Sequence, residues 1–397
     1  MEINMTQQLH KQRIELVVLE GGPCGGKSTG IHRIKQHFKS LGWMVLVSAE
    51  VPTRLVDEHD YVPGVNISFE AFQELVLQEV LRQEESLKKR ARESGHDKVL
   101  ILCDRGRFGG LGYTDHASFY KMAIEKFGLN KNDLFREYSG CVFLESTAVD
   151  APHVYLEYMT NNQARREKTV GEAVIQNNLS LDACVGVPRL FIIDNSTDFE
   201  QKITRVINVI EHLLAGVEYE RKYVPFSPRT FDLVTARQAL TLSHTHFVEL
   251  AISQGYLTLS KADVREGITT RRLRTESLDG DKNPLYILTL KGEKKEGGGR
   301  EEEVFISEVE HTCHLSDLDP KKIVIKKCRF LFVWGGRYCE LDVFETPEEQ
   351  DFILEIEHLP GENMSAVDLP FWLGSLKDGT NDSAYSNSNI AQVKQVG

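Results

Sequence analysis

The chain has 397 residues, a formal net charge of −12 and an apolar fraction of 41%. This length allows two or three domains, and we expect two. The acidic balance disfavours a general affinity for nucleic acid or anionic membranes, because those surfaces select a basic excess. Seven cysteines lie far apart without a CxxC pair, and no apolar run is long enough to cross a bilayer. We therefore expect a soluble, cytoplasmic protein in a reducing compartment.

The first predicted element is an apolar strand at residues 14–19, followed by a glycine-rich turn and an amphipathic helix that extends to about residue 41. The turn "GGPCGGKST" has the GxxxxGK[ST] spacing of a phosphate-binding loop. Its glycines let backbone N–H groups approach phosphate oxygens, its lysine neutralises phosphate charge, and its serine is a magnesium ligand. The predicted nucleotide-binding residues of this turn are Gly21, Gly22, Gly25, Gly26, Lys27, Ser28 and Thr29.

Strands and helices alternate through the first half of the chain. We predict further strands at 43–48, 98–103, 140–145 and 189–194, and helices that include 69–93 and 199–214. Such alternation predicts an α/β fold with a parallel sheet and helices on both faces. The strand at 98–103 is followed by Asp104 and Arg105, at the strand end where ligands of parallel sheets collect. We therefore expect Asp104 to hold magnesium directly or through water.

Two other polar segments are weaker candidates. The cation-rich run "NNQARREKT" offers Arg165 and Arg166 as a lid over the transferred phosphoryl group, although a solvated helix face explains the same pattern. Glu50 and Arg54 follow the second strand and are candidates for binding a phosphate acceptor. Cys24 lies within the phosphate-binding loop, which would make the loop sensitive to thiol reagents.

The first half resembles P-loop kinases of the nucleoside and nucleotide kinase kind, and more closely an AAA-type ATPase or kinase-like module. The markers are "LEGGPCGGKST", "CDRG", the arginine-bearing segment and "RLFIIDNSTDFEQKI". The resemblance covers about residues 12–214 and implies binding of ATP or another nucleoside triphosphate with Mg²⁺. It does not name an acceptor. We predict a kinase-like domain at 1–214 and a second domain at 215–397.

From about residue 217 the pattern changes to successive strands with charged residues at every second position. "EYERK" places Glu218, Glu220 and Lys222 on one face of an extended strand. The same alternation recurs in "RRLRT", "REEEVFI", "KKCRFLF", "CELDVF" and "LEIEHL". A solvated outer face explains any single pair. Six occurrences favour a closed sheet with a polar interior, whose apolar outer residues are covered by helices or by a neighbouring domain.

These segments, together with "YILTLKG" and the closing "DGTNDSAYSNSNIA", resemble the CYTH or triphosphate tunnel metalloenzyme superfamily in the order that the family shows. The resemblance spans about residues 216–391. It implies an α+β domain with an eight-stranded antiparallel tunnel that binds a triphosphate through cations and one or two Mg²⁺ or Mn²⁺ ions through carboxylates. The spacing around Arg300 departs from the usual RxExE pattern, which leaves open which of Glu301, Glu302 and Glu303 faces the tunnel.

The resemblance assigns roles to charged residues of these strands. The expected phosphate-binding residues are Lys222, Arg272, Arg274, Lys291, Lys327 and Arg329. The expected metal ligands are Glu218, Glu220, Glu355 and Glu357, with Glu301, Glu303, Glu340 and Asp342 as further candidates. One metal would position the triphosphate, and another would lower the pKa of the attacking water. The cations would stabilise the leaving diphosphate, and orthophosphate would be released.

Several functions stay open at this stage. The leading hypothesis is a bifunctional enzyme in which a P-loop kinase or ATPase is fused to a metal-dependent triphosphatase. The alternatives are an adenylyl cyclase of class IV, a P-loop half that only regulates the tunnel, and RNA 5′-end processing, which the acidic charge disfavours. The expected partners are small triphosphates and nucleotides, with no membrane partner, and the oligomeric state is undetermined. The histidines of "SHTHF" and "HTCHL" lack a complete zinc-ligand spacing.

Overall fold

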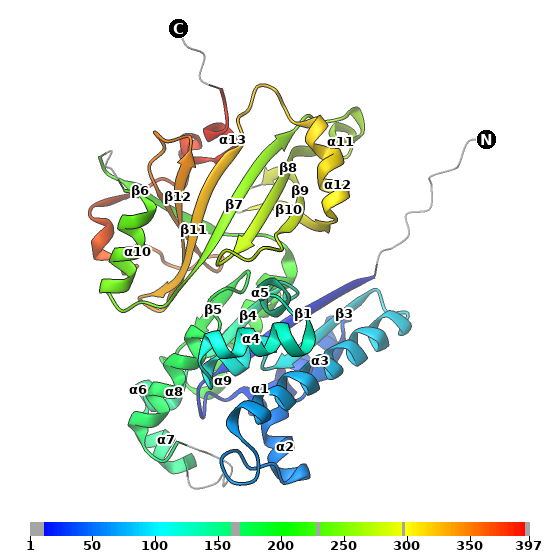
Figure 1. Cartoon of the computed structure of the whole chain (residues 1–397), viewed down its shortest axis with the longest axis vertical. Coiled ribbons are helices and arrows are strands. Elements are labelled where there is room, and N and C mark those ends of the chain that lie inside the picture. Colours follow the sequence, from blue (N-terminus) through cyan, green and yellow to red (C-terminus); the bar gives the residue numbers. More distant parts are fainter. Residues whose placement is uncertain (1–11, 160–166, 228–230, 296–297, 394–397) are drawn as a thin grey trace, which may run out of the picture. The chain divides into compact units, whose positions relative to one another are not determined.

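The computed structural model describes residues 12–159, 167–227, 231–295 and 298–393 (Figure 1). The chain divides into two compact units. The first comprises the residues up to Leu129 together with Asp133–Leu214, and the second comprises Asn130–Asn132 together with the residues from Ala215 onward. Arg165 and Arg166, the predicted lid arginines, lie outside the described residues.

The first unit is built on a five-stranded parallel sheet of order β2-β3-β1-β4-β5. Its strands are β1 (Arg13–Gly21), β2 (Met44–Ser48), β3 (Lys98–Asp104), β4 (Gly140–Leu144) and β5 (Leu190–Ile193). All five residues of β4 are buried, as are six of the seven residues of β3. Strands buried along their whole length are covered on both faces, as in α/β folds. The predicted α/β class of this half is therefore confirmed.

The helices of this unit separate the strands. They are α1 (Lys27–Ser40), α2 (Val51–His59), α3 (Phe69–Glu93), the 3₁₀ helix η1 (Arg107–Gly112), α4 (His116–Phe127), α5 (Lys131–Phe135), α6 (Thr147–Asp150), α7 (Pro152–Met159), α8 (Val170–Asp182) and α9 (Phe199–Ala215). Side-chain caps fix where several of them begin. Ser68, Asp115 and Thr169 each accept a hydrogen bond from a backbone N–H in the first turn of α3, α4 and α8.

The second unit contains a nine-stranded sheet of order β10-β9-β8-β7-β11-β12-β13-β6-β14, and the neighbouring strands among the described residues pair antiparallel. The strands are β6 (Glu220–Pro225), β7 (Phe247–Leu257), β8 (Ile268–Leu278), β9 (Leu285–Lys295), β10 (Gly298–Ile306), β11 (Ile325–Trp334), β12 (Arg337–Thr346), β13 (Ile353–Glu357) and β14 (Leu376–Asp378). The sheet thus has one strand more than the predicted eight, and no pairing among the described residues joins β10 to β14.

Short helices complete the second unit. They are α10 (Leu233–Leu242), α11 (Lys261–Arg265), α12 (Glu308–His314), α13 (Asn387–Ile390) and the 3₁₀ helices η2 (Leu315–Asp317), η3 (Phe371–Leu373) and η4 (Ser383–Tyr385). Strands β9 and β10 are antiparallel neighbours, and residues 296–297 between them lie outside the described residues.

The two faces of the nine-stranded sheet differ in character. On one face, Phe330, Leu341 and Leu354 pack with Ala236 and Leu240 of α10. Burying a large apolar side chain contributes roughly 1.5–3 kcal/mol, so this layer is the main core of the unit. The opposite face carries the alternating charged residues, and we call it the charged face. It comprises Glu220, Lys222, Arg272, Arg274, Glu276, Lys327, Arg329, Glu340, Asp342 and Glu355.

One end of the charged face is apolar. Ile325, Phe344 and Ile353 each lie two residues from a charged member of the face, and they form a buried cluster with Ile390 and Ala391 near the C-terminus. The C-terminal segment therefore packs against the sheet.

Candidate functional site

The phosphate-binding loop connects β1 to α1, as the sequence predicts. Gly26 precedes α1 with a φ of 95°, a left-handed conformation that glycine adopts without steric cost. At Gly25, a Cβ atom would lie 2.5 Å from the carbonyl oxygen of Leu144 on β4. The loop thus depends on glycine for both its conformation and its close approach to the neighbouring strand.

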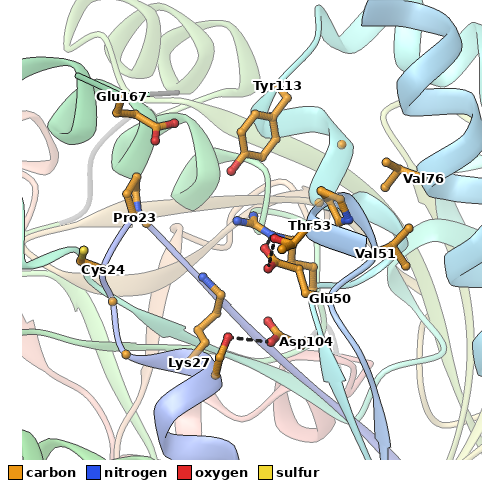
Figure 2. Close-up of a pocket in the computed structure, with 18 of the residues that line it drawn as sticks. Pro23, Cys24, Lys27, Glu50, Val51, Thr53, Val76, Asp104, Tyr113 and Glu167 are labelled. Carbon is orange, nitrogen blue, oxygen red and sulfur yellow. Dashed lines mark hydrogen bonds and ion pairs between the residues drawn. The ribbon is translucent and has the colours of Figure 1, made fainter. Parts of the chain in front are cut away.

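Lys27 and Ser28 are the first two residues of α1. The Lys27 ammonium donates a hydrogen bond of 2.8 Å to the carbonyl oxygen of Gly21, so it lies along the loop. Burial and the nearby Arg105 guanidinium lower the pKa of Lys27. The Ser28 hydroxyl donates to Oδ2 of Asp104 over 3.3 Å, and Figure 2 shows this bond beside the Lys27 side chain. Thr29 is exposed.

Asp104 is the last residue of β3 and is buried. Burial raises the pKa of its carboxyl group to about 6, because Lys27 and Arg105 compensate only part of the desolvation. Its second oxygen, Oδ1, is buried and has no hydrogen-bond partner among the described residues. A buried carboxylate oxygen beside a serine hydroxyl suits a hard divalent cation such as Mg²⁺. The residues present therefore fit a magnesium ion at this position.

Arg105 joins two carboxylates next to the loop. Its φ is +73°, and its guanidinium donates to Glu20 over 2.8 Å and to Glu50 over 3.1 Å. Glu20, at the end of β1, is fully buried. Glu20 was not among the predicted site residues, although an acidic residue directly after the apolar run at 16–19 is a usable signal, because a buried carboxylate needs a charged partner.

A cavity of about 1350 Å³ opens from the phosphate-binding loop within the first unit. Its polar end holds Lys27, Glu50, Asp104 and Arg105, and its other end is lined by apolar side chains of α2 and α3. Figure 2 shows Glu50 and Thr53 near Lys27 and Asp104, with Val51 and Val76 to one side. Arg54, the other predicted acceptor residue, does not line this cavity and pairs with Glu58 instead.

A buried ionic cluster supports one wall of this cavity. Arg107 of η1 donates to Glu84 of α3 over 2.8 Å and also pairs with Glu137. The Tyr138 hydroxyl donates to the other oxygen of Glu84 over 2.6 Å. Because Arg107 and Glu84 are both buried, their pairing holds α3 against η1. This pairing was not predicted, because its members are separated along the chain.

The charged face of the second unit brings the predicted residues of four strands together. Lys222 of β6 pairs with Glu355 of β13 and lies 3.0 Å from Glu220. On β11, Lys327 pairs with Asp342, and the structure buries both side chains almost completely. Arg329 stands opposite Asp342 in the strand register, and it donates to Asp342 over 2.7 and 2.8 Å and to Glu355 over 2.7 Å. It also pairs with Glu340.

Burial and ion pairing together shift the pKa values of residues on the charged face. Burial opposes ionisation of Glu355, but Lys222 and Arg329 outweigh it and hold the pKa of Glu355 well below its usual range. Burial likewise disfavours the Lys222 ammonium, but Glu355 and Glu220 raise its pKa. Glu340 differs, because burial dominates over Arg329 and raises its pKa to about 7. The face therefore contains both strongly ionised groups and one carboxyl group that titrates near neutrality.

A second group of ion pairs lies on β8 and β10. Arg274 donates to Glu303 over 2.6 Å and contacts Glu276 at 2.8 Å, while Arg272 contacts Glu303 at 3.2 Å. Among the members of the acidic run whose side chains the structure describes, Glu303 contacts both arginines. In the backbone register, Lys291 of β9 stands opposite Glu301.

Two predicted metal ligands lie at the margin of the charged face. Glu218 precedes β6 and is exposed, whereas Glu357 pairs with Glu220 in the backbone register and is partly buried. Across the part of the chain that the structure describes, no three His, Cys, Asp or Glu side chains are placed to hold a metal ion together. The carboxylates of the charged face instead pair with lysine and arginine.

Comparison with known proteins gives a family match for the first unit. The family described as "AAA domain" matches residues 16–202, which contain the phosphate-binding loop and Asp104. No curated protein sequence matches the chain. Together with the parallel sheet, the family match makes the first unit a P-loop-like α/β domain.

Solved structures show weaker similarity. The crystal structure of the inorganic triphosphatase NE1496 has 24% identity and a TM-score of 0.29, over 44% of this chain and 93% of its own. The PH1819 protein from Pyrococcus horikoshii OT3 has 19% identity and a TM-score of 0.26, over 37% of this chain and 80% of its own. At these scores the similarity does not establish a shared fold. Within the described residues, no helix has both the length and the apolar character needed to span a membrane.

Proposed function

We propose that the chain is a two-site enzyme acting on phosphate compounds. The first unit binds a nucleoside triphosphate with Mg²⁺ and acts on its terminal phosphate. The second unit is a divalent-metal-dependent triphosphatase that releases orthophosphate from a triphosphate. The observation that carries the triphosphatase assignment is the gathering of Lys222, Lys327 and Arg329 with buried carboxylates on one face of the nine-stranded sheet.

The first unit supports nucleotide binding through its own side chains. Lys27 lies along the loop, where it would neutralise charge on the β- and γ-phosphates, and the N-terminus of α1 adds favourable potential. Ser28 and the unpartnered oxygen of Asp104 would hold Mg²⁺, which neutralises phosphate charge when bound. Glu20 and Glu50 hold Arg105 in place beside them.

Buried charges explain why a triphosphate suits the second unit. Taking lysine and arginine out of water is costly, and their present partners are carboxylates. A triphosphate carries several negative charges and is an alternative partner for the same cations. Lys222, Lys327 and Arg329 would bind its oxygens, with Arg272, Arg274 and Lys291 as further contacts. These cations would also stabilise the charge that develops on the leaving diphosphate.

The carboxylates of the charged face have the hard oxygen donors that Mg²⁺ and Mn²⁺ prefer. Glu220, Glu340 and Glu355 are the proposed ligands, and a bound divalent ion would neutralise phosphate charge and lower the pKa of a coordinated water. In the structure these carboxylates are paired with Lys222 and Arg329. Metal binding on this face is therefore expected to require substrate phosphates, which compete for the cations.

A phosphate-release assay tests this function. The full-length protein carrying Lys27→Ala, which removes the P-loop lysine, would be incubated with tripolyphosphate, thiamine triphosphate or ATP and with Mg²⁺ or Mn²⁺. We expect orthophosphate from at least one compound, and none without metal. Release of pyrophosphate with cyclic AMP from ATP would instead establish a cyclase, and no turnover of any compound would contradict the proposal.

A substitution at Glu220 tests the metal assignment. Because a missing carboxylate ligand weakens both metal and substrate positioning, Glu220→Ala is expected to lower the hydrolysis rate by at least about 100-fold. Nucleotide binding by the first unit should stay unchanged. Glu345→Ala is the matched control, since Glu345 is an exposed residue of β12. Retained hydrolysis in the Glu220 variant would rule out this role.

A further inference from the structure

A buried serine links the phosphate-binding loop to α8 and to the segment after β5. Ser146 precedes α6 and is fully buried. Its hydroxyl donates a hydrogen bond to the carbonyl oxygen of Pro23 in the loop, and its backbone N–H donates to Oδ1 of Asn177 over 2.8 Å. Its carbonyl oxygen accepts a hydrogen bond of 2.9 Å from the Asn195 amide. Figure 2 shows Pro23 in the loop that leads to Lys27. The position of this loop therefore depends on Ser146.

Lys202 of α9 continues this network into the interior. Its ammonium donates to Oδ1 of Asn195 over 2.6 Å and to the carbonyl oxygen of Glu145 over 2.8 Å. Lys202 is 3% exposed, and both Lys202 and Asn195 line the cavity of the first unit. Three successive hydrogen bonds thus connect the ammonium, through Asn195 and Ser146, to the carbonyl oxygen of Pro23.

Lys202 carries a buried charge without an ionic partner. Among the described residues of the first unit, the buried lysines are Lys27 and Lys202. In that part of the chain neither ammonium has a carboxylate oxygen within ion-pairing distance, whereas the buried Arg107 pairs with Glu84. A buried charge without a partner is costly, so its presence beside a cavity points to an anion that the ligand supplies. For Lys27 that anion is the nucleotide phosphate, and the same reasoning applies to Lys202.

Charged side chains from several elements surround Lys202. They are Lys27 of α1, Glu145 after β4 with Asp150 of α6 beside it, Asp194 after β5 and Arg205 of α9. Burial lowers the pKa of Lys202 to about 8, although Glu145 and Asp194 favour the ammonium form. Burial and a hydrogen bond with Asp150 raise the pKa of Glu145 to about 7, and Asp194 pairs with Arg205. Lys202 therefore loses its positive charge as the pH rises through about 8.

The segment before Lys202 contacts the loop at a second point. Asn195 and Phe199 both line the cavity. The ring of Phe199, the first residue of α9, packs against the end of the loop, where a Cβ at Gly26 would lie 2.8 Å from it. The segment thus reaches the beginning of the loop through Ser146 and its end through Phe199. Its position affects where the backbone N–H groups of the loop meet phosphate oxygens.

We propose that Lys202 is a positioning residue for nucleotide binding. Through Asn195 and Ser146 it fixes the phosphate-binding loop, and its ammonium supplies a second positive charge, besides that of Lys27, for the phosphates of the bound nucleotide. This inference rests on the nucleotide-binding function proposed above. It assigns a role to a residue that lies outside the GxxxxGK[ST] spacing, because folding brings α9 to the loop.

Calorimetric titration of the full-length protein with Mg²⁺–ATP between about pH 7 and pH 9.5 tests this role. ATP binding that remains in a Lys27→Ala protein belongs to the second unit and is subtracted. In the natural protein, the dissociation constant should rise as the pH passes about 8, because the Lys202 charge is lost there. Lys202→Met should bind about tenfold more weakly at pH 7 and should lack this rise. Lys39→Met, an exposed change on α1, should behave like the natural protein.

Lys202→Arg is the second variant, and it carries the test if Lys202→Met does not fold. A guanidinium stays charged throughout this pH range, so the affinity of Lys202→Arg for Mg²⁺–ATP should stay constant across pH 8. Natural affinity in Lys202→Met at pH 7, or a rise near pH 8 that persists in either variant, would overturn the inference. If the natural protein bound no more ATP than Lys27→Ala does, the nucleotide-binding function itself would be contradicted.

Discussion

Asp104 combines a predicted functional role with a cost to stability. The raised pKa of about 6, against an ordinary value of 3.8, means that the folded state holds the proton more tightly than the unfolded state does. Between about pH 4 and pH 6 the unfolded chain loses this proton first, so stability falls as the pH rises. Above pH 6 the carboxyl group of Asp104 is ionised in both the folded and the unfolded state, and the loss of unfolding free energy is constant at about 3 kcal/mol.

Replacing this carboxyl group should therefore stabilise the protein without ligand. In urea unfolding, the gain in unfolding free energy from Asp104→Asn is expected to grow from near zero at pH 4 to about 3 kcal/mol above pH 6. The same variant should bind Mg²⁺–ATP more weakly. Asp115→Asn is the control of opposite sign, because backbone and hydroxyl hydrogen bonds from Ser118 lower the pKa of Asp115. A gain in unfolding free energy that did not change with pH would contradict the raised pKa of Asp104.

Lys327 tests the energetic importance of the charged face. Its side chain is 2% exposed and that of Asp342 is 1% exposed, so Lys327→Met leaves a buried carboxylate with Arg329 as its remaining partner. Removing one member of a buried pair costs roughly 3–5 kcal/mol of unfolding free energy. Because the Arg329 guanidinium still pairs with Asp342, we expect a loss near the lower limit of this range. Urea unfolding followed by tryptophan fluorescence measures the loss. Lys326→Met, an exposed change on the same strand, should alter stability by less than about 0.5 kcal/mol.

Individual residues differ in how far the sequence predicts them. The loop from Gly21 to Ser28 was predictable, because its spacing is local and each position has one chemical requirement. On the strands, an alternation of two residues predicted that Lys327 and Arg329 share a face. Glu20, the partner of Arg105, was not predicted, because the pair depends on a neighbour that folding brings from a distant segment. The predicted ligand Glu218 lies before the strand, where the alternation no longer applies.

At the scale of elements, the contact between the phosphate-binding loop and β4 gives a prediction. A Cβ at Gly25 would meet a backbone carbonyl, which has little freedom to move. Gly25→Ala is therefore expected to lower unfolding free energy by about 1–3 kcal/mol and to weaken ATP binding. Gly171→Ala in α8 is the matched control, because a Cβ there meets only one atom, 4.0 Å away. If Gly25→Ala and Gly171→Ala changed the unfolding free energy and the ATP affinity equally, the proposed clash with β4 would be contradicted.

Long elements were predicted better than short ones. The helix expected at 69–93 is α3, and the strand expected at 98–103 agrees with β3 within one residue. Their apolar periodicity extends over enough residues to be distinctive. β14 was missed because Leu376–Asp378 is a strand of three residues, which is too short to show an alternation. Its pairing with β6 depends on tertiary context.

At the scale of the whole molecule, each unit has its own core, and tryptophans report on them separately. Trp43 belongs to the first unit, while Trp334 and Trp372 lie in one aromatic cluster of the second. A Trp43→Phe protein therefore reports on the second unit alone. Saturation with Mg²⁺–ADP at 100 times its dissociation constant should stabilise the first unit by about 2.7 kcal/mol. Unfolding of the natural protein followed by circular dichroism should show this stabilisation. Unfolding of the Trp43→Phe variant followed by tryptophan fluorescence should be the same with and without Mg²⁺–ADP.

The C-terminal segment contributes directly to the charged face. Asn387 lies 3.3 Å from the Lys327 ammonium, and Thr380 accepts a hydrogen bond from the backbone of Lys222. During synthesis, every residue of the phosphate-binding loop and its cavity is made before residue 215. Asn387 is made much later in synthesis than these residues. A messenger truncated between the codons for residues 215 and 387 would therefore encode an intact nucleotide cavity and an incomplete second site.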